Sequence, residues 1–321
     1  MRVLIVHDSL SENPSKDELD TLDEVEQVAK ALTSTGYLVS RCAFSLNLPL
    51  LKKQIEKIHP DVIFNLVETL NGSRWLHIAT AFFEKLNIPF TGCGSRGMYL
   101  SSDKLLAKQL MKLALIPTPA WIENKKTDDI SQLIGVPVIV KPIAEEASVG
   151  ISDESVQTFK TEKALLNFLR KKGERLCFAE KYIEGREFNI SVMMDTSGVK
   201  VLPVAEMQFL DYPKNKVHIA GYEAKWDEES FAYTHTVRKF DFLETDTHLI
   251  EQLKEISLRC WNLFSGKGYA RIDFRVDKAG NPFVLEVNMN PCISSDSGFS
   301  AACAQSGLTY TAMIQNIVKG Y

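Results

Sequence analysis

The residue types best suited to chemistry lie in two short runs near the end of the chain. Arg271 and Asp273 alternate with apolar residues in the first run, as Glu286 and Asn288 do in the second. In two neighbouring strands, alternation would place each polar pair on one of two matching faces. Two carboxylates and an amide oxygen are hard ligands that suit Mg²⁺ bridging phosphates. The pattern therefore favours a metal site over a strand pair whose polar residues merely face solvent.

Two further segments could bind parts of a nucleotide. Lys141 ends an apolar run and is followed by a loop of small residues that includes Ser148. One cation and the N–H groups of such a loop suit a phosphate, although many lysines at strand ends are simply exposed. Residues 178–187 predict a strand, a turn and a second strand, which could present backbone groups to an adenine edge and a carboxylate to a ribose diol. An ordinary charged hairpin is the alternative, and both interpretations stay open.

The first third of the chain supplies a scaffold of alternating strands and helices. Apolar runs predict strands at 3–6, 37–42, 61–64 and 88–90, with helices at 48–58 and 75–86. A capping box of Thr21 and Glu24 predicts the start of the first helix, which ends at Gly36. This order implies an open parallel sheet. No glycine follows the first strand, so a dinucleotide-binding loop is absent and a nicotinamide dehydrogenase is disfavoured.

The pattern changes near residue 95. Helices are predicted at 102–113, 162–171, about 246–264 and 309–319, and strands at 138–141, 176–181, 187–194, 268–276 and 282–287. Residues 208–241 are polar and show no periodicity. A segment of that length is expected to be a functional loop or a disordered one. As a functional loop, it would close over a site.

The composition excludes several classes of protein. A chain of 321 residues fits two or three domains, and 45% hydrophobic residues with a net charge of −4 indicate an ordered protein. That charge argues against bulk nucleic-acid binding. No apolar run is long enough for a membrane span. Six dispersed cysteines without metal spacing predict buried free thiols in a reducing compartment, and hence a cytoplasmic protein.

The ordered set of motifs resembles the ATP-grasp superfamily, and within it the D-alanine–D-alanine ligases. The set comprises Asp103-Lys104, Lys141-Pro142, Ser148-Val149-Gly150, residues 180–187, Arg271-Ile272-Asp273-Phe274 and Glu286-Val287-Asn288. The resemblance implies an α/β fold in which an N-terminal parallel-sheet (pre-ATP-grasp) domain, residues 1–95, precedes a two-subdomain ATP-grasp fold. The small subdomain would span residues 96–183, and the C-terminal subdomain with the metal site residues 184–321.

The resemblance also implies a role for each matched residue. ATP and two Mg²⁺ ions, or Mn²⁺ in their place, would be bound. Lys104 and Lys141 would hold phosphates, Glu180, Lys181 and Ile183 would frame the adenine, and Glu187 would meet the ribose. Asp273, Glu286 and Asn288 would ligate the metals, Arg271 would steady the transferring phosphate, and Lys225 would touch the γ-phosphate. Ser148 and Ser297 would lie near the amino-acid substrates. A homodimer is common in this family.

Four departures from the family pattern fall near the amino-acid subsites. The loop after the first strand is longer and lacks glycine, which leaves Glu12 as the candidate for the family's ammonium-binding glutamate. The family's His-Gly and acidic run is replaced by residues 67–74, in which Glu68 and Arg74 are candidates for reading another substrate. Trp226 replaces a tyrosine, and Cys292 replaces a glycine.

These observations predict a carboxylate–amine ligase that works through an acyl phosphate on small amino-acid or peptide substrates. One hypothesis is a ligase with altered amino-acid subsites. A second is an authentic D-alanine–D-alanine ligase of cell-wall synthesis. A third is a nucleotide-binding regulator that has lost ligation, which the complete set of metal-ligand types disfavours.

Overall fold

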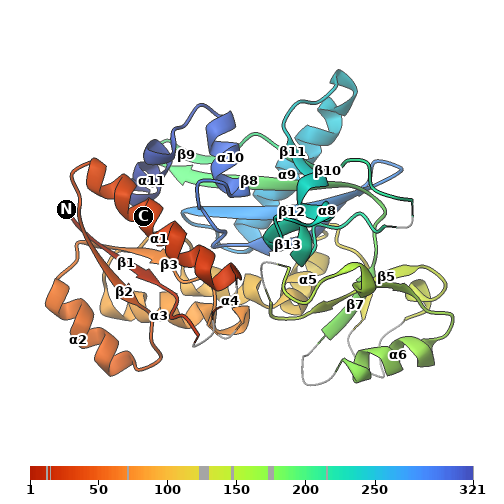
Figure 1. The fold of residues 1–321 in the computed structure, drawn as a ribbon, viewed down its shortest axis with the longest axis horizontal. Coiled ribbons are helices and arrows are strands. Elements are labelled where there is room, and N and C mark those ends of the chain that lie inside the picture. Colours follow the sequence, from red (N-terminus) through yellow and green to blue (C-terminus); the bar gives the residue numbers. More distant parts are fainter. Residues whose placement is uncertain are drawn as a thin grey trace.

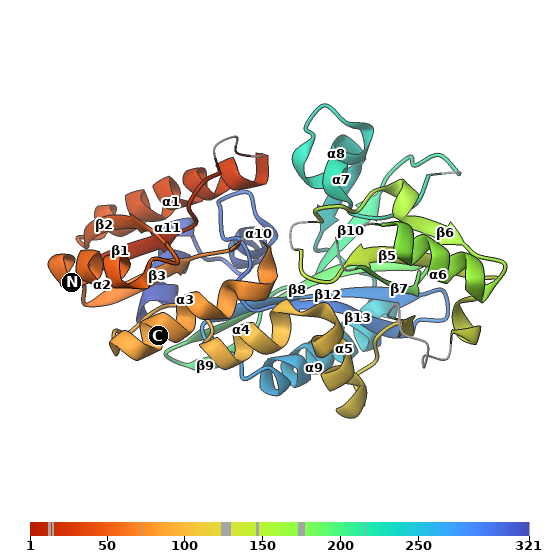
Figure 2. The same cartoon turned by 90° about the horizontal axis from the view of Figure 1, so that it is seen from below.

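The computed structural model describes residues 1–11, 14, 16–70, 72–122, 130–145, 148–172, 177–214 and 216–320. Three sheets with their covering helices follow one another across the molecule, and both chain ends lie in the N-terminal part (Figures 1 and 2). The mixed α/β fold agrees with the predicted class. None of the described helices is long and apolar enough to cross a lipid bilayer.

The first sheet is parallel, in the order β2–β1–β3, as predicted. Its strands are β1 (Arg2–His7), β2 (Leu38–Ala43) and β3 (Val62–Leu66). Successive side chains of a strand point to opposite faces, so β1 contributes to two cores. Helices cover both faces: α1 (Lys16–Ser34), α2 (Leu48–Ile58), α3 (Leu76–Leu86) and, from the far end of the chain, α11 (Tyr310–Lys319).

Two predictions for this part of the chain are wrong in detail. Helix α1 begins at Lys16, so Thr21 and Glu24 lie inside it and do not cap its N-terminus. Both side chains are buried, and a contact far away in the sequence, described below, occupies Glu24 instead. Residues 88–90 form only a single bridge, between Ile63 and Phe90.

The largest sheet is antiparallel and is where the candidate metal ligands lie. Its strands are β8 (Gly185–Asp195), β9 (Gly198–Val201), β10 (Ala205–Phe209), β11 (Thr236–Lys239), β12 (Tyr269–Asp277) and β13 (Pro282–Asn288), in the order β11–β10–β8–β12–β13 with β9 beside β8. Phe188, Ile190, Ile272 and Phe274 belong to the core on one face, under α9 (Thr247–Leu263). Since strands alternate, the opposite face carries the polar residues.

The third sheet, in the order β4–β7–β5–β6, is antiparallel and smaller. It consists of β4 (Trp121–Ile122), β5 (Pro137–Pro142), β6 (Val156–Thr158) and β7 (Cys177–Lys181), with α6 (Glu162–Lys171) against one face. Its apolar side chains form a core of their own, which contains Val138, Val140, Leu165, Leu169 and Ala179.

The remaining helices connect these sheets. They are α4 (Ser95–Ser102), α5 (Lys104–Leu113), α7 (Tyr222–Trp226), α8 (Phe231–His235) and α10 (Gly298–Gln305). Asp103 ends α4 and caps α5, accepting hydrogen bonds from the backbone of Leu105 and Leu106. The polar segment 208–241, predicted without regular elements, contains α7, α8 and β11. Its helices are only five residues long, which is too short for periodicity to reveal.

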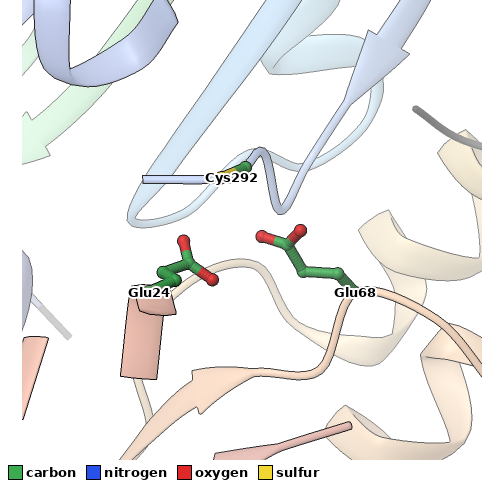
Figure 3. A group of neighbouring side chains, drawn as sticks. All are labelled: Glu24, Glu68 and Cys292. Carbon is green, nitrogen blue, oxygen red and sulfur yellow. The ribbon is translucent and has the colours of Figure 1, made fainter. Parts of the chain in front are cut away.

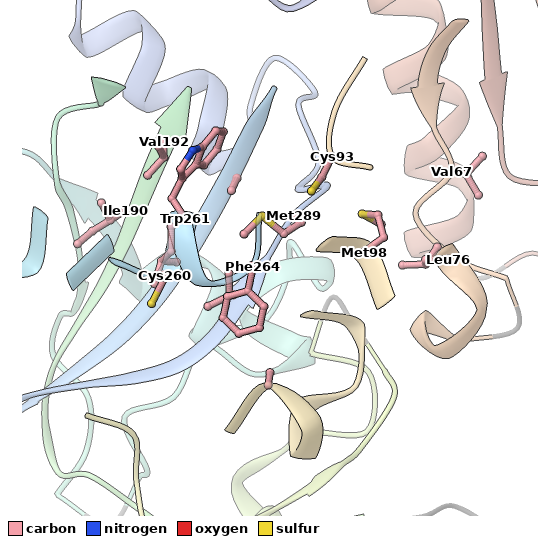
Figure 4. Packing of buried hydrophobic residues seen from close by; sticks show 14 of the residues in the cluster. Val67, Leu76, Cys93, Met98, Ile190, Val192, Cys260, Trp261, Phe264 and Met289 are labelled. Atoms are coloured by element: carbon pink, nitrogen blue, oxygen red, sulfur yellow. The ribbon is translucent and has the colours of Figure 1, made fainter. Parts of the chain in front are cut away.

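One continuous core joins the N-terminal sheet to the largest sheet. Val67 and Leu76 from the N-terminal part share it with Ile190, Trp261 and other residues from the C-terminal part (Figure 4). The two parts also meet backbone to backbone. Gly268 has a φ of +72°, and a Cβ there would lie 2.7 Å from the Cα of Gly92. The predicted domain boundaries of 1–95, 96–183 and 184–321 stay a prediction.

The six cysteines are all free thiols, as predicted. The predicted burial holds for Cys93, Cys260 and Cys303, whereas Cys42, Cys177 and Cys292 are half-buried.

Candidate active site

A cavity of about 560 Å³ lies where the three sheets meet. The polar face of β8, β12 and β13 lines it, together with the end of β5, part of β7 and the segment that contains α7 and α8. The N-terminal part contributes Asp8, Asp20 and Glu68. The cavity therefore collects residues that are far apart in the sequence, including nearly all of the predicted site residues.

Strand register explains how the three candidate metal ligands come together. Asp273 pairs with Glu286 across β12 and β13, and Arg271 pairs with Asn288. Directly opposite residues on antiparallel strands share a face, so these side chains all reach the cavity. Asn189 of β8 pairs with Asp273 from the other side and donates a 2.8 Å hydrogen bond to its Oδ1.

Cations surround the candidate metal ligands. Arg271 Nε and Nη2 lie 2.8 Å and 2.9 Å from the two oxygens of Asp273, and Lys104 Nζ lies 3.3 Å from Glu286 Oε2. Burial opposes ionisation of Glu286, but the nearby positive charges of Lys104, Lys225, Arg271 and Lys141 outweigh it and lower its pKa to about 2. Glu286 is therefore a charged oxygen ligand at neutral pH.

The donor set fits Mg²⁺. Asp273, Glu286 and Asn288 provide carboxylate and amide oxygens, which are the ligands that hard divalent cations prefer. The cations around them suit the triphosphate that accompanies such a metal in nucleotide sites.

Glu180 is bound between two lysines. Its Oε1 lies 2.6 Å from Lys141 Nζ, and its Oε2 lies 2.6 Å from Lys108 Nζ. Glu180 and Lys108 are almost completely buried. Burial opposes ionisation of Glu180, but the two lysines dominate and lower its pKa. The Glu180 side chain thus positions Lys141, whereas only its backbone is left to face a base.

The sequence does not predict Lys108 as a site residue. It lies in a periodic helix, where a lysine is expected on the exposed side, and nothing in the sequence indicates its partner on β7. Its Nζ also donates to Thr118 Oγ1 at 2.7 Å.

Arg275 is a second missed residue. It continues the alternation of Arg271 and Asp273 along β12, and this spacing could have revealed it. The buried guanidinium donates to the carbonyl oxygen of Ile183 at 3.0 Å and to Glu187 Oε2 at 3.2 Å. It thereby fixes two of the residues predicted to meet the adenine and ribose.

The predicted serines line the cavity but take part in local structure. Ser148 has a φ of +61°, and its Oγ donates to the carbonyl oxygen of Ala220 at 2.8 Å, which joins the small-residue loop to the segment before α7. Ser297 caps α10, accepting a hydrogen bond from the backbone of Ser300 at 3.2 Å. Trp226 and Lys225 reach the cavity from α7.

An acidic group lies at the N-terminal end of the cavity, where Glu68 and Cys292 line the wall and the neighbouring Glu24 is completely buried. Ligand atoms of Glu24, Glu68 and Cys292 lie within 4.8 Å of one another (Figure 3). Glu24 Oε1 accepts a 2.6 Å hydrogen bond from the backbone N–H of Ile293, 269 residues away in the sequence. Asp8 accepts hydrogen bonds from the backbone of Glu68 and Thr69.

The carboxyl groups at this end resist ionisation. Burial raises the pKa of Asp8 to about 7 and that of Glu24 to about 8, although backbone hydrogen bonds oppose both shifts. Burial raises the pKa of Glu68 well above its usual value, with further contributions from Glu24 and Asp8. The end of the cavity near the N-terminal sheet is thus acidic, and the end near β5 and β13 is basic.

Two predicted site residues do not line the cavity. Lys104 is not a lining residue, but its Nζ contacts Glu286, which lines the cavity. The same Nζ donates to the carbonyl oxygen of Glu145 at 2.6 Å. Arg74 is exposed and lies 4.0 Å from Asp103. A direct role for Arg74 in reading the substrate therefore has no support from its position. Glu12 lies outside the described residues.

The fold and this cavity together define an ATP-grasp ligase, and comparisons with known proteins agree. A family model described as the D-ala D-ala ligase C-terminus matches residues 109–319. A D-alanine–D-alanine ligase of Aquifex aeolicus is 31% identical over 91% of this chain and 92% of its own length. An uncharacterized protein of Sinorhizobium fredii, y4sG, is 29% identical over 80% of this chain and 73% of its own.

The fold is shared with a crystal structure of D-alanine–D-alanine ligase from Bacillus anthracis complexed with ATP. The TM-score is 0.76 at 21% identity, and the match covers 100% of this chain and 97% of that one. The chain belongs to the D-alanine–D-alanine ligase family. The resemblance and the enzyme class predicted from the sequence are thereby confirmed.

Proposed function

We propose that the protein is an ATP-dependent carboxylate–amine ligase whose amino-acid subsites differ from those of a D-alanine–D-alanine ligase. ATP would phosphorylate a substrate carboxylate, releasing ADP, and an amine would attack the acyl phosphate and displace phosphate. The acidic group of Glu24 and Glu68 beside Cys292 carries the proposal, because it adjoins a basic cleft with all the residue types that ATP chemistry needs.

The basic residues act on the phosphates. Arg271, Lys104, Lys141 and Lys225 neutralise the charge that moves from ATP to the carboxylate, and they hold the reacting oxygens in line. Asp273, Glu286 and Asn288 would hold two Mg²⁺ ions, or Mn²⁺ ions. Such ions supply charge neutralisation and orientation to the triphosphate.

The nucleotide's other end would be framed by the strand pair β7 and β8. Backbone groups of Glu180, Lys181 and Ile183 would face the adenine, and Glu187 would accept from the ribose. Arg275 supports this assignment, because its guanidinium donates hydrogen bonds to the backbone of Ile183 and to the side chain of Glu187 and so holds both residues in position.

The segment 208–241 would exclude water from the acyl phosphate, which would otherwise hydrolyse. Its contact with the small-residue loop through Ser148 and Ala220 supports this role, because one movement could then order both.

Authentic D-alanine–D-alanine ligation is the rival, and the 31% identity over 91% of the chain favours it. Against it, Trp226 can donate a hydrogen bond but cannot accept one or relay a proton as a tyrosine can. The experiment is ADP formation with D-alanine alone, compared with a panel of other D- and L-amino acids. A turnover of about 1 s⁻¹ or more on D-alanine, typical of an enzyme on its own substrate, would establish the rival. Binding of ATP without ADP formation on any pair would favour the regulator.

Two coarser expectations accompany this function. The substrates are small molecules, which fit the size of the cavity, and we expect the enzyme to work in the cytoplasm. A homodimer, common among relatives, is expected in solution.

A further inference from the structure

We infer that Arg238 is a specificity-determining residue of the ligase proposed above, and that its guanidinium holds a carboxylate of the attacking amine during the reaction. The inference rests on that proposed function. It gives a role to a charged residue of the cavity that the function leaves without one, and it states which chemical group of the amine this residue recognises.

Arg238 enters the cavity from β11, at one edge of the largest sheet. The strand order is β11–β10–β8–β12–β13, and Arg238 is one of the residues that line the cavity. Glu286 and Asn288, two of the candidate metal ligands, belong to β13 at the opposite edge. Arg238 therefore comes from the side of the sheet that lies away from these two ligands.

The guanidinium of Arg238 lies at the cavity wall and is not fully paired. Its Nε is buried and has no hydrogen-bond partner among the described residues. Its Nη2 lies 3.5 Å from the position that a Cβ on Gly298 would take. Gly298 and the preceding Ser297 also line the cavity, so the end of the guanidinium and the start of α10 meet at the same part of the wall.

The charges around Arg238 favour an anion at this place. Burial lowers the pKa of Arg238, and the positive charge of Arg271 lowers it further, whereas Asp296 opposes these two effects more weakly. The first N–H groups of α10 add positive partial charge at the same part of the wall. A negatively charged group bound there would stabilise the guanidinium, since a paired buried charge is far more stable than an unpaired one.

The donors at this place suit a carboxylate. A guanidinium is planar and donates two parallel hydrogen bonds to the two oxygens of a carboxylate. The hydroxyl of Ser297 accepts from the backbone of Ser300, and a hydroxyl that accepts can still donate its own hydrogen. Arg238 and Ser297 together therefore offer donors to both oxygens.

The chemistry of the proposed reaction assigns this carboxylate to the amine. One oxygen of the acid's carboxylate takes the γ-phosphoryl group of ATP, the amine nitrogen then attacks the carbonyl carbon, and phosphate leaves. That carboxylate is consumed, and it is proposed to react beside Arg271. The carboxylate of an amino acid that serves as the amine stays unchanged throughout, so it can remain bound to Arg238 while its amino group reacts.

The test separates the amine from the steps before it. The full chain with Mg²⁺ and ATP is first given a panel of D- and L-amino acids as the acid, with hydroxylamine as a nucleophile that has no carboxylate. Hydroxylamine nitrogen attacks the acyl phosphate, phosphate leaves, and a hydroxamate forms that can be measured by its colour with iron(III). The acid found in this way is then paired with amino acids as amines and with the carboxamides of the same amino acids.

We expect kcat/KM for the best amino-acid amine to exceed that for its carboxamide by roughly ten to a hundred times, the value of a charge-assisted contact. Arg238→Gln should remove most of this preference and raise the KM of the amine. Hydroxamate formation, which involves no carboxylate on the nucleophile, should be retained with the KM for ATP. Arg238→Lys keeps the charge and should keep part of the preference. Lys239→Gln, the exposed neighbour on β11, is the control and should keep all of it.

Hydroxamate formation by Arg238→Gln also shows that the variant is folded. Equal use of amino acids and carboxamides by the unmodified protein would overturn the inference, as would an Arg238→Gln variant that keeps the preference. Loss of hydroxamate formation in both Arg238→Gln and Arg238→Lys would overturn it too, because Arg238 would then act on the acid or the phosphate. These results leave the ligase in place. Absence of ADP and hydroxamate with every acid would refute the ligase itself, and this role of Arg238 with it.

Discussion

Arg271 and Asp273 form a two-pronged ion pair within a single strand, with 2.8 Å and 2.9 Å between their paired atoms. The residue proposed to steady the phosphate thus occupies the carboxylate proposed to hold a metal. Both oxygens of Asp273 must be released, at least in part, before a cation can use them. Metal binding and release of the Arg271 side chain toward the phosphate are therefore linked.

This linkage gives a prediction for Arg271→Met. Without the arginine, Asp273 loses its ion pair, keeps the hydrogen bond from Asn189, and has one positive charge fewer beside it. Mn²⁺ in the absence of nucleotide should therefore bind roughly ten times more tightly. ADP formation should be lost. Electron paramagnetic resonance of free Mn²⁺ measures the affinity. Unchanged or weaker binding would mean that Asp273 is not a ligand.

Glu286→Gln should behave in the opposite way. It removes a charged ligand and leaves the surrounding lysines uncompensated, so Mn²⁺ binding and turnover should both fall while the melting temperature changes little. Glu184→Gln, an exposed glutamate paired with Lys278, is the matched control and should change neither.

The two lysines on Glu180 should have separable roles. Lys141→Met is expected to weaken ATP binding by roughly tenfold to a hundredfold, the value of a charge-assisted contact to phosphate. Lys108→Met breaks a buried pair and should lower the free energy of unfolding by about 3 kcal/mol. Urea unfolding and nucleotide titration measure the two effects. The exposed Lys112→Met provides the control, and equal effects of the two buried changes on nucleotide binding would contradict the division.

The segment from Asp211 to His235 should exchange its amide hydrogens more slowly when ATP analogue and substrate are bound. Its attachments to the rest of the empty protein are hydrogen bonds and one ion pair, such as the 3.1 Å hydrogen bond from the backbone of Tyr222 to Ile151 and the pair of Lys216 with Asp153. Deuterium uptake measured by mass spectrometry, with β12 as an internal reference, tests the prediction. Full protection without ligands would show that the segment is no lid.

Stability of the empty protein should fall as the pH rises. Folding raises the pKa of Glu24 from 4.5 to about 8, so the folded chain binds the extra proton across this window. The contribution is complete below pH 4.5 and decreases above it by about 1.4 kcal/mol per pH unit. The titratable groups around Glu24 are Asp8, Asp20, Glu68, Cys292, Tyr269 and Tyr310. Burial also raises the pKa of Asp8, to about 7, and that of Glu68, so these two carboxyl groups add to the slope.

Urea unfolding between pH 5 and 8 measures the slope. Glu24→Gln should make the slope shallower, leaving the part that Asp8 and Glu68 contribute, and Glu26→Gln should leave it unchanged. A slope that Glu24→Gln leaves unchanged would assign the effect to another group.

The sequence predicts the scaffold well, and it also predicts that Asp273 and Glu286 share one face, because both depend on local patterns. Alternation along β12 and β13 is enough to bring Asp273 and Glu286 to one face. The strand register then places the two residues directly opposite each other. Glu24 shows where such reasoning stops. Read locally, it forms a capping box with Thr21, but its role depends on Ile293, which no local pattern connects to it.

The burial of Lys108 and Arg275 also depends on partners that are distant in the sequence. A buried charged residue looks in sequence like an exposed one, since only its partner distinguishes the two. For Lys108 the partner is Glu180, on a strand far along the chain.

The contact of Gly268 with Gly92 has a mechanical consequence. Because the two backbones are in direct contact, the N-terminal and C-terminal parts have little room to shift against each other there. The same two parts also share one apolar core. We therefore expect these two parts to behave as one rigid unit. The sheet of β4, β7, β5 and β6 has a core of its own, so any movement that closes the cavity is expected to shift this sheet as a unit. The acidic end of the cavity, with Asp8 and Glu68, therefore belongs to the rigid part of the molecule, and Lys141 on β5 to the part expected to shift.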